Sequence, residues 1–192
     1  MQYGLIGEHL PHSFSKEIHE KLASYTYELH ELAPDELDAF MRTKEFRAIN
    51  VTIPYKQDVI PYLDEISDSA KEIGAVNTIV NRGGRLCGYN TDYLGMTALI
   101  RKIGLELTGK TVLILGTGGT SHTAQYVARH LGAAEVRTVS RSGRDGSLTY
   151  EQAAAEYSGA QIILNTTPSG MFPNPDAQAI DLTPFLSLEG VV

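Results

Sequence analysis

The sequence predicts an α/β protein with two lobes, one over residues 1–104 and one over residues 105–192. Strand-like and helix-like patterns alternate along the first lobe, which is typical of a small α/β unit. In the second lobe, the near-continuous apolar run Thr111-Val112-Leu113-Ile114-Leu115 indicates a parallel strand buried on both faces. With 42% hydrophobic and 20% charged residues, the 192-residue chain has the composition of an ordinary globular protein.

Charge and cysteine content narrow the range of partners. The net charge is −7 and no long run of lysine or arginine occurs, so we expect neither nucleic acid nor an anionic membrane as a partner. The single cysteine, Cys87, lies in an apolar run and is predicted to be a small core residue, with no intramolecular disulfide and no metal site. No signal peptide or membrane span is visible, so we expect a cytoplasmic protein. We also expect it to be a monomer or a homodimer.

The elements of the first lobe follow from apolar spacing and from turn residues. In chain order we expect a strand at 2–7, a helix at 13–24, a strand at 25–32, a helix at 34–44, a strand at 48–53 and a helix at 55–65. A helix at 68–73, strands at 75–80 and 85–89, and a helix at 92–103 follow. Phe14, Ile18 and Leu22 mark the apolar side of the helix at 13–24, and Leu94, Leu99 and Ile103 mark that of the helix at 92–103.

The first lobe is organised around the heptad Asn50-Val51-Thr52-Ile53-Pro54-Tyr55-Lys56. Pro54 cannot donate to a sheet ladder, so the strand should end there. Alternation then places Asn50 and Thr52 on one face of the strand. Lys56, beside a hydroxyl and an amide, can supply a proton and fix a polyhydroxylated ligand. The alternative is a polar strand end with a solvated lysine.

Other polar residues lie at the ends of predicted elements. Ser13 and Ser15 flank a helix start, where two hydroxyls and the positive helix end can bind a carboxylate, although Ser13 could also be an ordinary N-cap. Asp92 falls in the first turn of its helix, where an acid commonly stabilises the dipole. Asn77 could likewise be a strand residue that faces water.

A glycine-rich turn follows the buried strand of the second lobe. Gly116-Thr117-Gly118-Gly119-Thr120-Ser121 leads into a helix that ends at Gly132, and a strand at 135–140 comes next. This order is the context of a dinucleotide fingerprint, in which the first glycine permits a tight turn and the second lets pyrophosphate approach. Ser121 stands where the fingerprint has its third glycine. We expect nucleotide binding at this turn.

The residues after the second strand indicate which dinucleotide binds. NAD sites place an acid there, whereas NADP sites use arginine for the 2′-phosphate. The strand here ends in Ser140-Arg141-Ser142-Gly143-Arg144, with no acid at its tip, which favours NADP over a merely solvated basic loop. After a helix at 149–157, the strand at 161–164 ends in Asn165-Thr166, a third polar strand exit.

Together these motifs resemble the shikimate dehydrogenase family along the whole chain. In chain order they are Ser13-x-Ser15 after Pro11-His12, Asn50-Val51-Thr52-Ile53-Pro54-x-Lys56, Gly74-Ala75-Val76-Asn77-Thr78, Gly88-x-Asn90-Thr91-Asp92, Gly116-x-Gly118-Gly119-x-Ser121, Arg141, and Asn165-Thr166-x-Pro168-x-Gly170-Met171.

The resemblance implies a substrate-binding domain at 1–104, a Rossmann-type NADP-binding domain at 105–192, and NADP-linked reduction of 3-dehydroshikimate to shikimate in aromatic amino-acid (chorismate) biosynthesis. It implies a catalytic pair, Lys56 and Asp92. It implies substrate contacts from Ser13, Ser15, Thr52, Asn77 and Asn90, and cofactor contacts from Gly116, Gly118, Gly119, Ser121, Ser140, Arg141, Arg144, Asn165 and Thr166.

Two departures qualify what the resemblance implies. The family usually has asparagine where this chain has Ser140, and family members continue beyond the position of Val192 with a Tyr-x-Pro strand and helices that carry a substrate-binding glutamine. We therefore expect the Rossmann domain to be incomplete, and the 192-residue chain alone to be less stable than a longer version, to self-associate and to have little dehydrogenase activity. The alternatives are a quinate/shikimate dehydrogenase relative that uses NAD or both cofactors, or a non-catalytic ligand-binding fragment.

Overall fold

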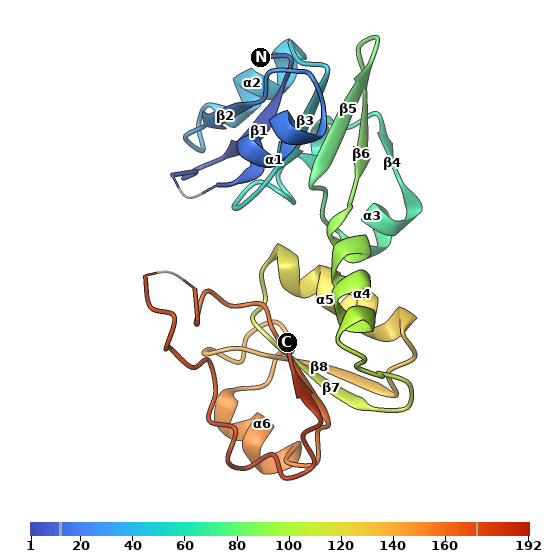
Figure 1. Cartoon of the computed structure of the whole chain (residues 1–192), viewed down its shortest axis with the longest axis vertical. Coiled ribbons are helices and arrows are strands. Elements are labelled where there is room, and N and C mark those ends of the chain that lie inside the picture. The colour runs from blue at the N-terminus through green and yellow to red at the C-terminus, as the bar shows by residue number, and fades with distance from the viewer. Residues whose placement is uncertain (12, 172) are drawn as a thin grey trace. The chain divides into compact units, whose positions relative to one another are not determined.

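The computed structural model describes residues 1–11, 13–171 and 173–192, and the chain forms two compact units (Figure 1). The first unit is Met1–Thr91 and the second is Asp92–Val192. The division lies before helix α4 (Asp92–Lys102), not after it as the sequence led us to expect. The reason is packing, because the buried Ile100 of α4 belongs to one apolar cluster with Leu107 and Val112 of the second unit.

The first unit is built on a mixed six-stranded sheet within the described residues. Its strands are β1 (Tyr3–Gly7), β2 (Glu28–Glu31), β3 (Ala48–Val51), β4 (Glu65–Ile66), β5 (Thr78–Arg82) and β6 (Arg85–Tyr89), in the order β2-β1-β3-β5-β6-β4. β1 pairs in parallel with β2 and with β3, while β5 runs antiparallel to both β3 and β6. The predicted hairpin of β5 and β6 is confirmed.

Three α-helices accompany the sheet within the described part of this unit, namely α1 (Ser15–Leu22), α2 (Leu37–Thr43) and α3 (Asp68–Ile73). α3 shows why the local sequence is helical. The hydroxyl of Ser67 accepts the amide of Ala70 at 3.3 Å, and Gly74 ends the helix in the left-handed region with φ of 70°. The predicted limits of α3 are therefore confirmed.

The helix expected at 55–65 does not form. The chain makes turns there, followed by a single 3-10 turn, η1 (Ile60–Tyr62), and by β4. Pro61 lies inside the stretch and cannot donate a helical hydrogen bond. The amides of Ile60 and Tyr62 instead bind the carbonyls three residues earlier, at 3.1 Å each.

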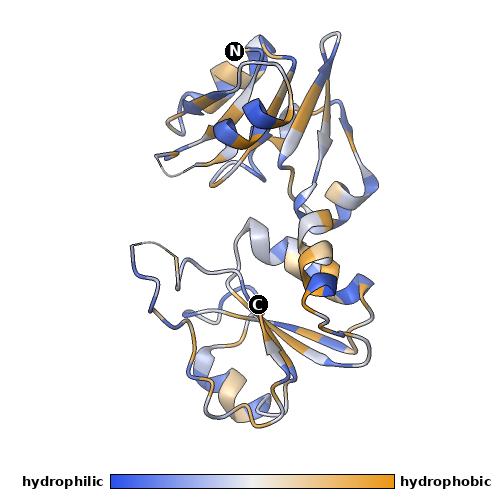
Figure 2. Cartoon of the chain, in the orientation of Figure 1, coloured by the Kyte–Doolittle hydropathy of each residue, from blue (hydrophilic) through white to orange (hydrophobic). Residues whose placement is uncertain are grey.

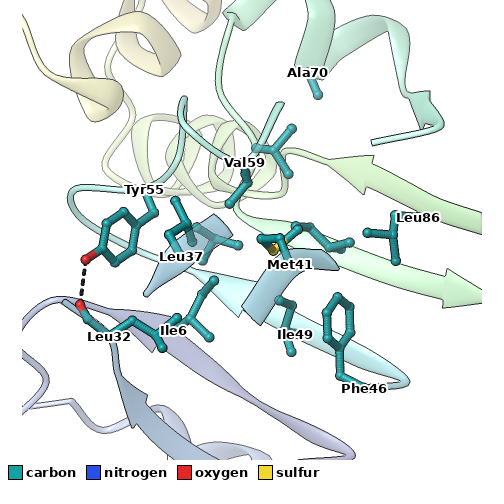
Figure 3. Packing of buried hydrophobic residues seen from close by; sticks show 13 residues of the cluster. Ile6, Leu32, Leu37, Met41, Phe46, Ile49, Tyr55, Val59, Ala70 and Leu86 are labelled. Carbon is teal, nitrogen blue, oxygen red and sulfur yellow. Dashed lines mark hydrogen bonds between the residues drawn. The ribbon is translucent and has the colours of Figure 1, made fainter. Parts of the chain in front are cut away.

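The core of the first unit lies between α2, the turns after β3 and the sheet (Figure 3). Leu37 and Met41 of α2 are buried with Ile6 and Val51, as their helical spacing predicts. Tyr55 is buried among them, and its hydroxyl donates to the carbonyl of Leu32 at 2.5 Å. Burial raises the pKa of Tyr55, so this hydroxyl keeps its proton.

The prediction that the apolar faces of two helices are buried is wrong. Within α1, which lies wholly in the described residues, no side chain is buried, and Phe14, Ile18 and Leu22 are 54–79% exposed. Leu94 of α4 and Ile103, which directly follows this helix, are more than half exposed, and it is Ile100 that enters the core. Helical spacing identified an apolar stripe on each helix but not whether a neighbouring element covers it.

The second unit has a four-stranded parallel sheet in its described part, with helices around it. The strands are β7 (Thr111–Leu115), β8 (Glu135–Val139), β9 (Ile162–Asn165) and β10 (Gly190–Val191), in the order β10-β9-β7-β8, and the helices besides α4 are α5 (Gly119–His130) and α6 (Tyr150–Glu156). Val112 and Ile114 enter one cluster and Leu113 and Leu115 another, so β7 is buried on both faces, as predicted. Figure 2 shows hydrophobic residues along the strands of each unit.

The start of α6 is set by a capping box. Thr149 accepts the amide of Gln152 at 3.2 Å, and the side chain of Gln152 accepts the amide of Thr149 at 2.8 Å. Among the helices that the structure describes, none is long and apolar enough to cross a bilayer.

Candidate active site

Polar residues gather at one edge of the first unit's sheet because of its strand directions. β1 and β3 are parallel and end at the same edge, and Asn50 near the end of β3 pairs with Thr78 at the start of the antiparallel β5. Thr78 in turn pairs with Tyr89 at the end of β6. The segments that follow β1 and β3, precede β5 and follow β6 therefore begin or end at this edge. We call the polar residues that these segments carry the polar edge; it consists of Ser13, Ser15, Thr52, Lys56, Asn77 and Asn90.

Main-chain bonds hold Thr52 and Lys56 at the polar edge. The amide of Thr52 binds the carbonyl of Ile6 at 2.9 Å, and the carbonyl of Lys56 accepts the amide of Val76 at 2.8 Å. Both side chains are partly exposed. A side chain at Gly7 would put its Cβ 2.6 Å from the Thr52 methyl group, so glycine is needed where the end of β1 lies against Thr52. Ile53, which was expected inside a strand at 48–53, is 70% exposed because β3 ends at Val51.

Asn77 is the centre of a buried hydrogen-bonded group. Its Oδ1 accepts the amide of Thr91 at 2.8 Å, and its Nδ2 donates to the Thr91 hydroxyl at 3.0 Å. Asn77 is only 7% exposed, so the alternative in which it faces water is wrong. Asp92 follows Thr91 directly and begins α4, as predicted. Asn90 is 3% exposed, and its Nδ2 donates to the carbonyl of Ala75 at 3.0 Å.

Ser13 and Ser15 lie at the start of α1 and are partly exposed. The N-cap position belongs to Phe14, so the interpretation of Ser13 as N-cap is wrong by one residue. The Ser13 hydroxyl instead accepts the amide of Ser15 at 3.3 Å. His12, which precedes them in the family motif, lies outside the described residues.

The sequence reasoning missed two members of this network. Tyr27 is 2% exposed, and its hydroxyl donates to Asn50 Oδ1 at 2.6 Å. Thr78 accepts from Asn50 Nδ2 and donates to Asn77 Oδ1, at 3.1 Å each. The only signal was indirect, since Tyr27 lies in a strand predicted at 25–32, and in the folded sheet β1 separates β2 from β3, which carries Asn50.

In the second unit, three parallel strands end side by side. Leu115 at the end of β7 pairs with Val139 of β8 on one side and with Asn165 of β9 on the other. β8 lies on one side of β7 and β9 lies on the other, so the strand order reverses between β7 and β9. Ligands of open α/β sheets bind outside the carboxyl ends of the strands at such a point. The glycine-rich turn, the Ser140–Arg144 loop and Asn165-Thr166 therefore share one edge of this sheet.

The glycine-rich turn fits a phosphate group. Gly116 has φ of 105°, and a Cβ there would lie 2.9 Å from the Thr166 hydroxyl, so this position requires glycine. A Cβ at Gly118 would meet no atom within 4 Å, which leaves open space beside the first turn of α5. Ser121 is fully buried, and its Oγ has no hydrogen-bond partner among the described residues. Amides at the start of a helix are what a pyrophosphate needs, whereas the buried Ser121 hydroxyl is not accessible to a ligand.

The loop after β8 exposes two arginines on a self-contained turn. Arg141 and Arg144 are exposed, while the amide of Ser140 binds the carbonyl of Leu148 at 2.8 Å. The Ser147 hydroxyl donates its single proton to the Arg144 carbonyl at 2.6 Å. In the 2.8 Å contact between the hydroxyls of Ser140 and Ser147, Ser140 is therefore the donor. The hydroxyl proton of Ser140 thus forms a hydrogen bond within the loop, and this bond holds the loop that carries the two arginines.

Thr166 is bonded to the end of β7, and Asn165 to the loop that follows it. Thr166 donates both its amide, at 3.0 Å, and its hydroxyl, at 2.6 Å, to the Leu115 carbonyl. Asn165 Nδ2 donates to the carbonyl of Ser169 at 3.0 Å, and its Oδ1 accepts the amide of Thr167. Thr166 and Thr167 are the residues that lie beside Gly116.

Replacing Ser121 with alanine is expected to stabilise the protein without changing its response to NADP. Removing a buried hydroxyl that lacks a partner should raise the free energy of unfolding by about 1 kcal/mol or more. Any rise in melting temperature that NADP induces should stay the same, because the buried hydroxyl is not accessible to a ligand. Thermal denaturation with and without NADP measures both effects.

Ser147→Ala is the matched control, because Ser147 is also buried but its hydroxyl is bonded. It should lower the stability of the free protein. A Ser121→Ala protein destabilised to the same degree would contradict the prediction.

The comparisons with known proteins point to one family. Residues 5–79 match the family model described as the shikimate dehydrogenase substrate binding domain. The shikimate dehydrogenase (NADP(+)) of Clostridium beijerinckii is 39% identical, over 91% of this chain and 70% of that protein, and that of Geobacillus kaustophilus is 36% identical, over 94% and 73%.

Solved structures agree with this assignment. Shikimate dehydrogenase 1 from Peptoclostridium difficile superposes with a TM-score of 0.87 at 34% identity, covering 100% of this chain and 76% of that one. Shikimate 5-dehydrogenase from Thermus thermophilus, solved in complex with NADP(H) and shikimate, gives a TM-score of 0.83 at 27% identity, covering 100% and 77%. By sequence and by structure, the chain belongs to the shikimate dehydrogenase family.

Proposed function

We propose that this protein catalyses the NADP-dependent reduction of 3-dehydroshikimate to shikimate, an oxidoreductase reaction of aromatic amino-acid biosynthesis. Relatives that are 32–39% identical over most of the chain carry the name NADP(+)-dependent shikimate dehydrogenase. The observation that carries the proposal from the structure itself is the polar edge, where segments far apart in sequence begin or end. Shikimate is a carboxylate with three hydroxyls, and this edge offers hydroxyl, amide and ammonium groups.

Each group at the polar edge has a proposed task. Ser13 and Ser15 bind the carboxylate through their hydroxyls at the positive end of α1. Thr52, Asn77 and Asn90 hold the ring hydroxyls, since the buried amides are already oriented by Thr91 and Ala75. A second charged residue, Asp92, in the first turn of α4, is the proposed acidic partner in catalysis.

Lys56 has the proposed role of general acid. Its ammonium group donates a proton to the substrate's C3 oxygen as the carbonyl becomes a hydroxyl. NADPH, when bound, supplies the hydride. The turn after β3 fixes the main chain of Lys56 through the bond to Val76, so the ammonium group is delivered to the edge that binds the hydroxyls.

The proposed cofactor residues lie in the second unit. Gly116, Gly118 and Gly119 give the pyrophosphate access to the first turn of α5, in which Ser121 is the buried residue at the third position of the fingerprint. Arg141 and Arg144 bind the 2′-phosphate, on a loop closed by the hydrogen bonds of Ser140. Asn165 and Thr166 line the exit of β9 on the cofactor's side, with Thr166 next to Gly116. A cytoplasmic location, and a monomeric or homodimeric state, stay predictions from the sequence.

The function is tested by two independent readouts. With 3-dehydroshikimate present, the protein should oxidise NADPH, followed by its absorbance, and calorimetric titration should show binding of shikimate. Quinate, which lacks the ring double bond, serves as the comparison ligand. Failure of both NADPH oxidation and shikimate binding would overturn the proposal, and equal turnover with NADH would overturn the cofactor assignment.

A further inference from the structure

We infer that the hydroxyl of Tyr27 is a positioning group for substrate recognition, because it fixes the Asn50 amide and, through Thr78, the amide of Asn77. The inference rests on the proposed function, since it concerns how the polar edge recognises shikimate. Tyr27 itself is not placed against the substrate. It acts through a chain of hydrogen bonds that ends at the edge.

Tyr27 is held firmly enough to act as an anchor. It precedes β2, is 2% exposed and belongs to an apolar cluster with Leu5 and Leu10. The ring of His19 stacks on it, with centroids 4.0 Å apart and planes at 11°. Burial, with a smaller effect from Tyr25, raises the pKa of Tyr27, so its hydroxyl remains a donor at all physiological pH values.

The partners of Asn50 determine which end of its amide is oxygen. Asn50 Nδ2 lies 3.3 Å from the carbonyl of Asn77, and a carbonyl oxygen only accepts. The NH₂ group must therefore face Asn77, which directs Oδ1 toward Tyr27. The Tyr27 hydroxyl donates to that oxygen at 2.6 Å and so completes the only orientation that satisfies both neighbours.

The orientation is passed on to Asn77. Because Asn50 Nδ2 donates to the Thr78 hydroxyl, the single proton of Thr78 is directed to Asn77 Oδ1. That oxygen also accepts the amide of Thr91. The Thr91 hydroxyl lies 3.2 Å from the same oxygen, so the oxygen end of the Asn77 amide is fixed by groups of Thr78 and Thr91, and its NH₂ end is the donor, with one bond to the Thr91 hydroxyl. In the chain from Tyr27 through Asn50 and Thr78 to Asn77, each hydrogen bond therefore has one defined donor and one defined acceptor.

The test is Tyr27→Phe, which keeps the stacked ring and removes the hydroxyl. Losing one hydrogen bond in the chain should raise KM for 3-dehydroshikimate about 3- to 10-fold. We expect kcat to stay within about 2-fold and KM for NADPH to stay unchanged, because neither Lys56 nor the second unit is altered. Tyr25→Phe is the matched control, since the Tyr25 hydroxyl bonds His19 at 2.6 Å and not Asn50.

A second variant separates positioning from general stability. Thr78→Val breaks the same chain one step later, so the double variant Tyr27→Phe with Thr78→Val should raise KM little more than either change alone. A merely structural role for Tyr27 would give additive losses, and would shift the KM of NADPH with that of 3-dehydroshikimate. Either result would overturn the inference, as would an unchanged KM in Tyr27→Phe.

NMR distinguishes failure of this inference from failure of the proposed function. The side-chain amide resonances of Asn50 and Asn77 should shift in Tyr27→Phe and not in Tyr25→Phe, with no substrate present. A wild-type protein that neither binds shikimate nor reduces 3-dehydroshikimate would refute the function. Amide resonances unmoved by Tyr27→Phe would refute the positioning role even in an active enzyme.

Discussion

The Lys56→Ala enzyme is expected to turn over on the order of 10²-fold more slowly than the wild type, with KM for 3-dehydroshikimate within a few-fold. In the proposed mechanism, Lys56 supplies the proton to the oxygen that gains electron density as the hydride arrives. The same proposal assigns ground-state recognition to the other groups of the polar edge, so binding should change little. The main-chain bond from Val76 to the Lys56 carbonyl does not depend on the side chain, which preserves the local fold.

Steady-state kinetics with varied 3-dehydroshikimate measure this effect. Lys71→Ala is a matched control, because Lys71 is an exposed lysine of α3 within the same unit. Its kcat should equal that of the wild type. An unchanged kcat in Lys56→Ala would remove this lysine from the chemistry.

Replacing Arg141 with alanine should weaken NADP binding by about 1.5–3 kcal/mol and leave NAD binding nearly unchanged. Arg141 is exposed on the loop after β8, where it is available to the 2′-phosphate that distinguishes the two cofactors. The loop keeps its shape without this side chain, because it is closed by the bonds of Ser140 to Ser147 and Leu148. Calorimetric titration with each cofactor gives both values.

Arg129→Ala is the control for this prediction. Arg129 is an exposed arginine of α5 whose side chain donates to Gln125 one turn earlier. Its replacement should alter neither titration. Equal losses of NADP and NAD affinity in Arg141→Ala would mean that the arginine acts on a phosphate common to both cofactors.

The elements that the sequence predicted well have strong local causes. β7 was recognisable because burial on both faces requires an unbroken apolar run, and α3 because Gly74 ends it. The edge position of Thr52 followed from the expected end of its strand at Pro54, whereas Asn77 was expected inside a strand at 75–80 and lies just before β5. Whether their predicted roles hold is a matter for the kinetic tests.

Other features depend on tertiary context that the sequence does not display. The helical pattern at 55–65 is overridden by Pro61 and by the pairing of Glu65 and Ile66 with β6. The apolar stripe of α1 is exposed because nothing in the described residues packs against it, which no spacing rule reveals. The role of Tyr27 needed the register of the sheet, because the residue lies 23 positions from its partner Asn50.

Three main-chain amides at or beside the polar edge bind across the first unit and not to their neighbours along the chain. The amide of Val51 is bound to the carbonyl of Asn77, that of Thr52 to Ile6, and that of Val76 to Lys56. None of these bonds survives separation of the strands, so the segments of the polar edge cannot take up their structure before the sheet forms. In native-state hydrogen exchange these three amides should exchange with the slow, globally protected class, and the recognition surface should appear and disappear together with the whole sheet.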